Sequence, residues 1–400
     1  MDPPPQDTDD VISIFSYDSD EDATPASFST TELEKAVREH LHLDSCRLVK
    51  LAEGGYHKIY EVLAADSKPL NVVVRVAAPA FPKDKMESEI ATMRYIAEHT
   101  DIHTPMVYHW NTDINSVGLE YMIMEKIQGR SASEVWDSLD FEKKEVMVSE
   151  VAHHLNQLFR LRFSTAGSLY PGSDGKIVVG PVVSTPFYAA LDGVTRVRQA
   201  VDLAEYRGPF DTASSYVASF LKAELHVVQH HREHILEHEL DGDEETLERG
   251  IEVLNKAVEL SLVYPGDTCI SEPLTSPGQP FSLRMDDFRL SNIMIDDDGH
   301  IQGFIDFEGA TVAPLWDCAS MPLWLQDPDE WDGTHEGGSD ERLRALFWER
   351  IKEEDPTGEW LRACEKGRWF RRFSNMLSLN VGVWAHPRCW TPFRSILTVL

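Results

Sequence analysis

The decisive stretch of this 400-residue chain reads Met285-Asp286-Asp287-Phe288-Arg289-Leu290-Ser291-Asn292, followed by Ile-Met-Ile-Asp-Asp-Asp-Gly-His-Ile-Gln-Gly-Phe-Ile-Asp306. Residues 293–295 and 301–305 suit two short buried strands. Asp298-Gly299 between them is a strong hairpin signal, because glycine readily adopts the positive φ that a tight turn requires. Such a hairpin brings Asn292 and Asp306 close together at its open end.

The same stretch carries the residue types that phosphoryl transfer needs. That reaction requires an oxygen base to orient the attacking hydroxyl, and oxygen ligands that hold Mg²⁺ against the phosphates. Asp287 is the candidate base, and Asn292 and Asp306 are the candidate metal ligands. The spacing Asp-x4-Asn matches the catalytic loop of the protein-kinase fold. The plainer alternative is a solvated acidic turn with Asp287 as a helix cap, but it does not explain why the spacing and the hairpin indicate one site.

Four further stretches lie upstream: residues 53–62 (EGGYHKIYEV), 72–76 (VVVRV), 87–93 (ESEIATM) and 121–129 (YMIMEKIQG). With them, the chain resembles the aminoglycoside phosphotransferase family, also described as the phosphotransferase enzyme family, and especially its fungal branch. The resemblance runs from about residue 48 to about residue 326. It implies an α+β, bilobal, protein-kinase-like fold. The small β-rich N-lobe is expected over residues 28–127, and the larger, mainly helical C-lobe over residues 128–400.

The resemblance also implies a nucleotide site. The first stretch is similar to the family's glycine-containing phosphate loop, and the second to the strand that carries a phosphate-contacting cation. The third is similar to the helix whose glutamate pairs with that cation, and the fourth to the hinge that receives adenine. The cofactor-binding residues so implied are Gly54, Gly55, Arg75, Glu89, Met124, Glu125 and Ile127. ATP is the expected donor, with GTP as the alternative, and Mg²⁺ is the expected metal.

Each motif has a physical rationale and a plainer alternative. Gly54 and Gly55 remove side-chain bulk, so that backbone N–H groups can approach phosphate oxygens, although a glycine pair alone is more often a plain hairpin turn. Arg75 follows three valines and needs a carboxylate partner, for which Glu89 is the candidate. That pair could also be a purely structural ion pair. The hinge stretch reads first as a buried strand.

Met285 and Arg75 depart from the protein-kinase pattern. Family members usually have histidine at the position of Met285, and methionine can fill the space but cannot supply the hydrogen bond. Arg75 replaces lysine, keeps the charge and can bind phosphate with two N–H groups. Asp317 matches a family aspartate that braces the catalytic loop, with a helix N-cap as the alternative. Glu308 could contact a second metal, but a solvated loop residue is the expected role.

Composition limits the partners. The chain is 42% hydrophobic, enough for one large core or two lobes. Its net charge of −31 at pH 7 argues against nucleic-acid binding and is a mild hint of an amine-bearing small-molecule substrate. No stretch approaches the ~20 apolar residues of a membrane span, and no signal peptide is evident. The five scattered cysteines suggest neither a disulfide framework nor a zinc site, so a cytoplasmic protein is expected.

The rest of the chain has a simple predicted organisation. Residues 1–27 are rich in Pro and Asp and are predicted to be a disordered acidic tail. A capping-box signature near Thr31 indicates the start of a short helix. The C-lobe is predicted to contain helices at 132–162, 214–240 and 244–262 and a hairpin at 167–183.

One more feature is a histidine-rich helix. His230, His234 and His238 recur every four residues, a spacing that can place two imidazoles on one metal. A polar helix face with neutral histidines is the favoured interpretation.

The sequence therefore predicts a Mg²⁺-dependent small-molecule kinase that transfers the γ-phosphate of ATP or GTP to a substrate hydroxyl, with an aspartate base. The competing hypothesis is a nucleotide- or ligand-binding module that has lost catalysis. Met285 is its main support, and the intact Asp287, Asn292 and Asp306 are its main obstacle.

Overall fold

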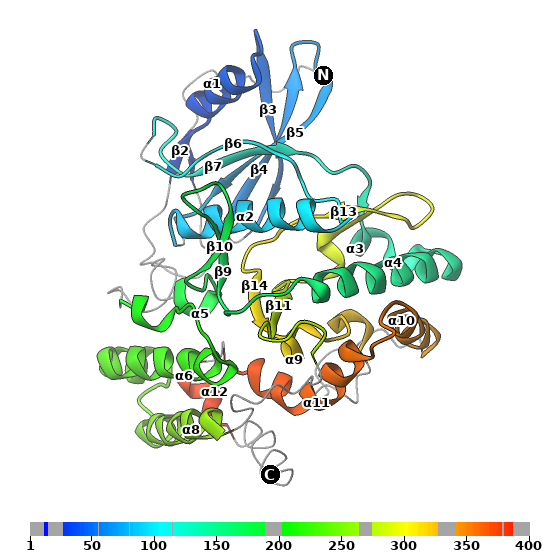
Figure 1. Cartoon of the computed structure of the whole chain (residues 1–400). Coiled ribbons are helices and arrows are strands. Elements are labelled where there is room, and N and C mark those ends of the chain that lie inside the picture. The colour runs from blue at the N-terminus through cyan, green and yellow to red at the C-terminus, as the bar shows by residue number, and fades with distance from the viewer. Residues whose placement is uncertain are drawn as a thin grey trace.

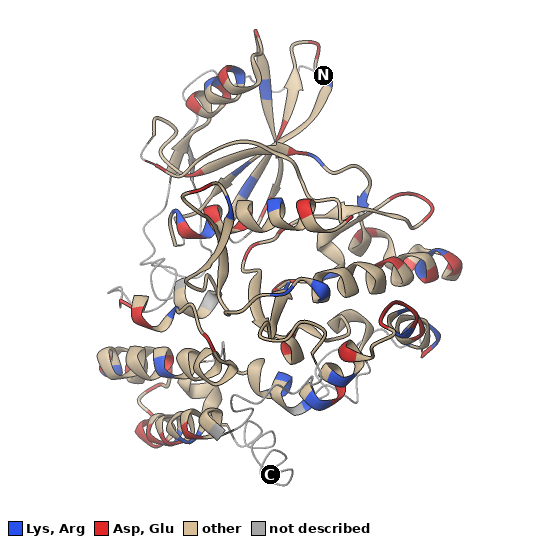
Figure 2. Cartoon of the chain, in the orientation of Figure 1, with Lys and Arg blue, Asp and Glu red and all other residues tan. Residues whose placement is uncertain are grey.

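The structure is a computed structural model that describes residues 12–14, 27–54, 56–79, 81–113, 115–188, 202–263, 274–326, 341–377 and 380–386. It has two lobes, a sheet-rich one above a helix-rich one, and helix α2 (Asp84–His99) lies across their junction (Figure 1). Acidic and basic residues are spread over helices of both lobes rather than gathered on one element (Figure 2). The predicted α+β bilobal architecture is confirmed.

The N-lobe is built on a five-stranded antiparallel sheet in the order β3-β4-β5-β7-β6. Its strands are β3 (Cys46–Glu53), β4 (His57–Ala64), β5 (Pro69–Ala77), β6 (Val107–Asn111) and β7 (Tyr121–Glu125). Alternate residues of β5 face opposite sides of the sheet. Val74 and Val76 pack in the cluster that includes helix α1 (Thr30–Leu41), and Val73 packs in the cluster that includes α2. Arg75 has the same parity as Val73 and therefore faces α2.

The start of the chain differs from the prediction in two details. Strand β1 (Ile12–Ile14) pairs with β2 (Ser27–Ser29), so Ile12–Ile14 and Ser27 of the predicted disordered tail lie in strands. The alternation Ile-Ser-Ile suits a short strand, because one face can stay apolar. The other residues of that tail lie outside the described part. Helix α1 is capped by Ser29, whose hydroxyl accepts from the Glu32 N–H, rather than by a threonine.

The C-lobe is mainly helical. Its helices are α3 (Ala132–Val135), η1 (Trp136–Ser138), α4 (Phe141–Arg160), α5 (Thr185–Tyr188), η2 (Ala204–Tyr206), α6 (Ala213–His230), α7 (Arg232–His238), α8 (Glu244–Val263), η3 (Leu290–Asn292), α9 (Leu315–Cys318), η4 (Leu323–Leu325), α10 (Glu341–Glu354), α11 (Glu359–Ser374) and α12 (Val381–Trp384). Two helices predicted as continuous are interrupted: the first by η1 and Leu139, the second at His231. Among the described helices, none is long and apolar enough to cross a membrane.

The C-lobe also contains short strands, some of which flank residues 285–306, the stretch that holds the candidate site. They are β8 (Arg130–Ser131), β9 (Ser168–Pro171), β10 (Ile177–Gly180), β11 (Phe281–Arg284), β12 (Ile293–Ile295), β13 (Ile301–Phe304) and β14 (Thr311–Pro314). β11 pairs with β14, and β12 lies between β8 and β13. The predicted hairpin at 167–183 is confirmed as β9 and β10.

Candidate functional site

The predicted hairpin after the catalytic stretch is confirmed. Strands β12 and β13 pair antiparallel, with Ile293 opposite Phe304. Gly299 in the turn has φ +89°, and a Cβ there would lie 2.6 Å from the Lys143 carbonyl oxygen. Glycine is therefore required at this turn for both its backbone conformation and its lack of a side chain.

The hairpin brings Asp287, Asn292 and Asp306 to one place. The Asn292 side-chain N–H donates to the Asp287 carbonyl at 2.9 Å, and the Ile305 N–H donates to the Asn292 carbonyl at 3.0 Å. Asp306 follows directly, in the left-handed region at φ +63°. The side chains of Asp287 and Asp306 are 39% and 38% exposed, so both remain open to a ligand.

Asp306 has an oxygen that fits a metal-binding role. Its Oδ1 is buried and accepts no hydrogen bond within the described part of the chain. The nearby cation is Arg75, whose Nη1 is 3.8 Å away. A carboxylate oxygen and the Asn292 amide oxygen are hard donors of the type that Mg²⁺ prefers. The residues present therefore fit a magnesium ion.

The predicted Arg75–Glu89 ion pair is present between β5 and α2. Arg75 donates to both Glu89 oxygens at 2.6 Å, and the two side chains are only 5% and 2% exposed. Burial acts to lower the pKa of Arg75, but Glu89, Asp306 and Glu308 outweigh it and raise the pKa. Arg75 is thus a permanent cation facing the carboxylate of Asp306, the candidate metal ligand. Its role with a nucleotide remains a prediction.

Glu308 corrects an expectation from the sequence. It is not a solvated loop residue: its side chain is 11% exposed, and it accepts from Lys85 at 3.0 Å and from Arg75 at 3.4 Å. His57 Nε2 lies 3.3 Å from the same carboxylate. Burial, with Arg75 and Lys85 nearby, holds the pKa of His57 well below its ordinary value, so this imidazole is neutral.

Lys85 and His57 were not predicted as site residues. Lys85 is buried and precedes Glu89 by four positions on α2, so the two share one helix face. That spacing was the available signal in the sequence. Glu308, the partner of Lys85, is 223 positions away in the chain, so no spacing in the sequence indicated this contact.

The glycine loop is only partly described. The Gly54 N–H donates to the His57 carbonyl at 2.9 Å, and a Cβ on Gly54 would meet no atom within 4 Å. Packing therefore gives no reason for glycine at this position, and the space beside it is open. Gly55 lies outside the described residues. The ring of Tyr56, next along the loop, lies over the Lys85 ammonium at 4.8 Å.

The expected hinge residues form the end of β7 and the segment after it. Met124 and Ile127 are buried, and Met124 pairs with Val73 in the sheet. Glu125 is the residue tied to its surroundings, because its carboxylate accepts from the Met106 N–H at 3.2 Å and lies 3.2 Å from His103 Nε2. The structure thus confirms a strand here and leaves the adenine role a prediction.

The catalytic loop is supported indirectly by Asp317. This aspartate lies inside α9, so the N-cap alternative is wrong. Its Oδ2 accepts from Arg284 at 3.1 Å, and Arg284 also pairs with Asp286 in the loop. Burial acts to lower the pKa of Arg284, but Asp317 and Asp286 outweigh it and raise the pKa. Asp317 therefore reaches the loop through an arginine.

Two side chains flank the candidate base. Met285 is buried and packs in the main apolar cluster, where histidine would be expected in the family. Asp287 forms an ion pair with the exposed Arg289. This pair occupies one carboxylate oxygen, and an acceptor hydroxyl would have to share Asp287 with it.

A cavity of about 920 Å³ lies beside the catalytic loop in the C-lobe. Met285, Asp286 and Phe288 are among its lining residues, whereas Asp287, Asn292 and Asp306 do not line it. Its charged lining includes four arginines and three acids: Arg284, Arg368, Arg371, Arg372, Asp286, Asp317 and Glu365. The lining is therefore mixed in charge, which does not single out a cationic ligand.

The fold and the site together define a bilobal kinase-like protein. The family described as the phosphotransferase enzyme family matches residues 48–348, and the chain belongs to this family. Family membership supports a small-molecule phosphotransferase.

Relatives and solved structures agree with this assignment at low identity. A subtelomeric hrmA-associated cluster protein of Aspergillus fumigatus is 26% identical, over 75% of this chain and 67% of its own length. An altered inheritance of mitochondria protein 9 of Yarrowia lipolytica is 24% identical, over 45% of this chain and 35% of its own length. The gentamicin complex of APH(2″)-IIa has a TM-score of 0.50 and 13% identity, covering 92% of this chain and 95% of that one, and shows the fold alone.

Proposed function

We propose that this protein transfers the γ-phosphate of ATP, or of GTP, to a hydroxyl of a small molecule, with Mg²⁺ as cofactor. The observation that carries the proposal is the meeting of three residues at one end of a hairpin, where Asp287, Asn292 and Asp306 lie opposite the Arg75–Glu89 pair. Family membership supports the phosphotransferase class. The nucleotide, the metal and the acceptor belong to the proposal.

Each site residue has a proposed role that follows from its chemistry. Asn292 and Asp306 would hold Mg²⁺, which supplies neutralising charge between the phosphates. Arg75, fixed by Glu89, would contact phosphate oxygens from the N-lobe side, and the open space at Gly54 admits them close to the backbone. Asp287 would orient the acceptor hydroxyl and take its proton. Positioning and electrostatic stabilisation together provide the catalysis.

The acceptor would sit in the cavity beside the catalytic loop. Asp286 and Phe288, the chain neighbours of Asp287, line that cavity, so an acceptor hydroxyl would approach the base from this side. The net charge favours an amine-bearing acceptor, but the mixed lining gives equal reason to test acidic alcohols. A screen therefore needs both chemical types.

The competing function is nucleotide or ligand binding without turnover. Two observations favour it: Met285 in place of histidine, and the engagement of Asp287 by Arg289. The contact from Asn292 to the Asp287 carbonyl argues against it, since the loop is held in shape without a histidine.

The test is transfer of labelled γ-phosphate to a panel of amine-bearing and acidic alcohols, with and without Mg²⁺. Asp287→Asn should reduce turnover by ~10³-fold and leave nucleotide binding intact. Asp297→Asn is the matched control, because Asp297 lies in the turn of the same hairpin, pairs with Arg130 and is 90% exposed. Turnover that survives in Asp287→Asn removes this residue from the mechanism.

A further inference from the structure

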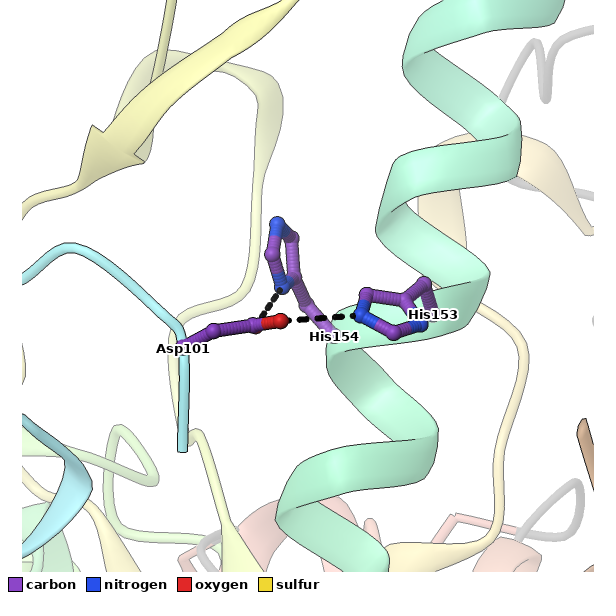
Figure 3. Close-up of side chains that lie close together, drawn as sticks. All are labelled: Asp101, His153 and His154. Atoms are coloured by element: carbon purple, nitrogen blue, oxygen red, sulfur yellow. Dashed lines mark hydrogen bonds and ion pairs between the residues drawn. The ribbon is translucent and has the colours of Figure 1, made fainter. Parts of the chain in front are cut away.

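We propose that Asp101, His153 and His154 bind one divalent transition-metal ion, with zinc as the best-suited metal, at a site distinct from the magnesium site. Asp101 follows α2 at the lower edge of the N-lobe, and the two histidines are consecutive on α4 of the C-lobe. Figure 3 shows the carboxylate of Asp101 directed between the two rings. A bound ion would join the two lobes at this position.

The distances already suit a shared ion. Asp101 Oδ2 lies 3.3 Å from His153 Nε2, and Oδ1 lies 3.5 Å from His154 Nδ1. Two ligands that are each ~2.1 Å from one tetrahedral zinc ion are ~3.4 Å apart. One ligand atom from each of the three residues lies within 4.8 Å of the others, so small side-chain adjustments would bring all three to one ion. Asp101 and His153, 63% and 39% exposed, have room to adjust.

His153 has the support that a metal-binding histidine usually has. Its Nδ1 lies 2.8 Å from both oxygens of Glu354 at the end of α10. Such a carboxylate fixes the proton on Nδ1 and leaves the Nε2 lone pair for a metal. The Gln157 amide nitrogen lies 2.7 Å from Nε2 and competes for that lone pair.

His154 supplies an independent reason to expect a ligand. Its Nδ1 is buried and makes no hydrogen bond within the described residues, although Asp101 Oδ1 lies 3.5 Å away. A buried polar atom that makes no hydrogen bond is costly. A metal ion would satisfy this nitrogen.

The donor set selects the class of metal. Imidazole nitrogens favour zinc and its transition-metal neighbours, whereas Mg²⁺ favours oxygen ligands. Among the described residues, this is the group of three or more histidine, cysteine or acidic side chains that comes close enough to share one ion. The histidine-rich segment does not form a comparable group: His226 and His230 stack on one side of the helix break at His231, and His234 and His238 pack on the other.

The test is a titration of the full chain, freed of its purification tag and of bound metal. Zn²⁺ is followed by calorimetry, and Co²⁺ by the visible absorption that tetrahedral sites give. One ion should bind per chain and raise the melting temperature. Asp101→Asn, conservative and at an exposed position, and His153→Ala should each weaken binding by at least ~10-fold, as loss of even an outer partner does. Glu354→Gln should also weaken it, and Gln157→Ala should strengthen it by removing the competing donor.

Two control variants separate this site from the others. His238→Ala, in the histidine-rich segment, and Asp306→Asn, in the magnesium site, should leave zinc affinity unchanged. Zinc binding that is lost in His238→Ala but retained in Asp101→Asn would overturn the proposal. So would the absence of binding up to millimolar zinc, which would make the three residues a hydrogen-bonded cluster between the lobes and nothing more.

Discussion

The two faces of the proposed phosphoryl-transfer site differ in burial and in pairing. On the N-lobe face, Arg75 and Lys85 are buried and held by Glu89 and Glu308. On the C-lobe face, Asp306 is over a third exposed and keeps an oxygen with no hydrogen bond in the described part. Buried charges are tolerated only when they are paired. The charges of the N-lobe face are therefore already paired in the structure, whereas the C-lobe face keeps a carboxylate that can bind a cation.

This comparison explains the position of Glu308. Its carboxylate lies against the two cations that the incoming phosphates would approach. It keeps Arg75 and Lys85 compensated, and the phosphates of a nucleotide would have to share these cations with it. The acids and cations of this cluster belong to both lobes, so the cluster also ties the lobes together.

The largest expected effect on turnover comes from a substitution on the C-lobe face of the site. Asp306→Asn removes the charge of the proposed metal ligand, and turnover should fall by ~10²–10³-fold, the range for loss of one key electrostatic group. Magnesium should then no longer improve nucleotide binding. Steady-state rates and nucleotide affinity across a magnesium series measure both. Turnover that keeps its magnesium dependence in this variant would show that Asp306 is not a ligand.

A substitution on the N-lobe face of the site should lower the stability of the folded protein. Glu89→Gln leaves Arg75 with weaker partners in a buried position, and the free energy of unfolding should fall by about 3 kcal/mol. Glu87→Gln is the matched control on the same helix, because its ion-pair distance to Lys83 is a long 3.9 Å. Urea unfolding of the two variants gives the comparison. Equal stability of both would mean that the Arg75–Glu89 pair contributes nothing measurable.

Much of this site follows from local sequence, and the remainder depends on distant partners. Spacing and turn chemistry predicted the hairpin, and the need of a buried arginine for a carboxylate, together with the family resemblance, predicted the Arg75–Glu89 pair. Glu308 was misjudged because a single loop acid looks solvated until its cations, from another lobe, are in place. The support from Asp317 was expected at the loop itself but passes through Arg284. These are tertiary pairings that no periodicity encodes.

Glu224, a buried acid in the C-lobe, contrasts with the paired charges of the N-lobe face. Glu224 on α6 accepts from the Val381 N–H at 2.8 Å and has no ion pair with a cation among the residues that the structure describes. Burial raises its pKa from the ordinary 4.5 to about 7, against the pull of that N–H, and Glu239 adds to the rise. Because the folded pKa is raised, the stabilisation is complete below about pH 4.5 and is lost as the pH rises through about 7.

Glu224→Gln should remove this pH dependence. Its melting temperature should match that of the unmodified protein in mild acid and exceed it above neutral pH, where its free energy of unfolding should be higher by about 3 kcal/mol. Melting curves across the pH range provide the measurement. A parallel pH dependence in both proteins would show that Glu224 is ionised in the folded state.

The smallest expected effect is at Met285. The catalytic loop is already held by Asn292 and by Arg284 with Asp317, so Met285→His should change turnover by less than ~3-fold, well under 1.4 kcal/mol in barrier height. A large increase would show that the loop is impaired as it stands and would favour the binding-module hypothesis. Comparing kcat for the two proteins decides the point.

The most direct measurement is a thermal-shift titration with ATP and GTP, each with and without Mg²⁺. The account predicts that nucleotide raises the melting temperature mainly when Mg²⁺ is present, and that Asp306→Asn abolishes the magnesium-dependent part. An equal shift with and without Mg²⁺, or no shift at millimolar nucleotide, would contradict the claim that Asn292 and Asp306 form a working metal site.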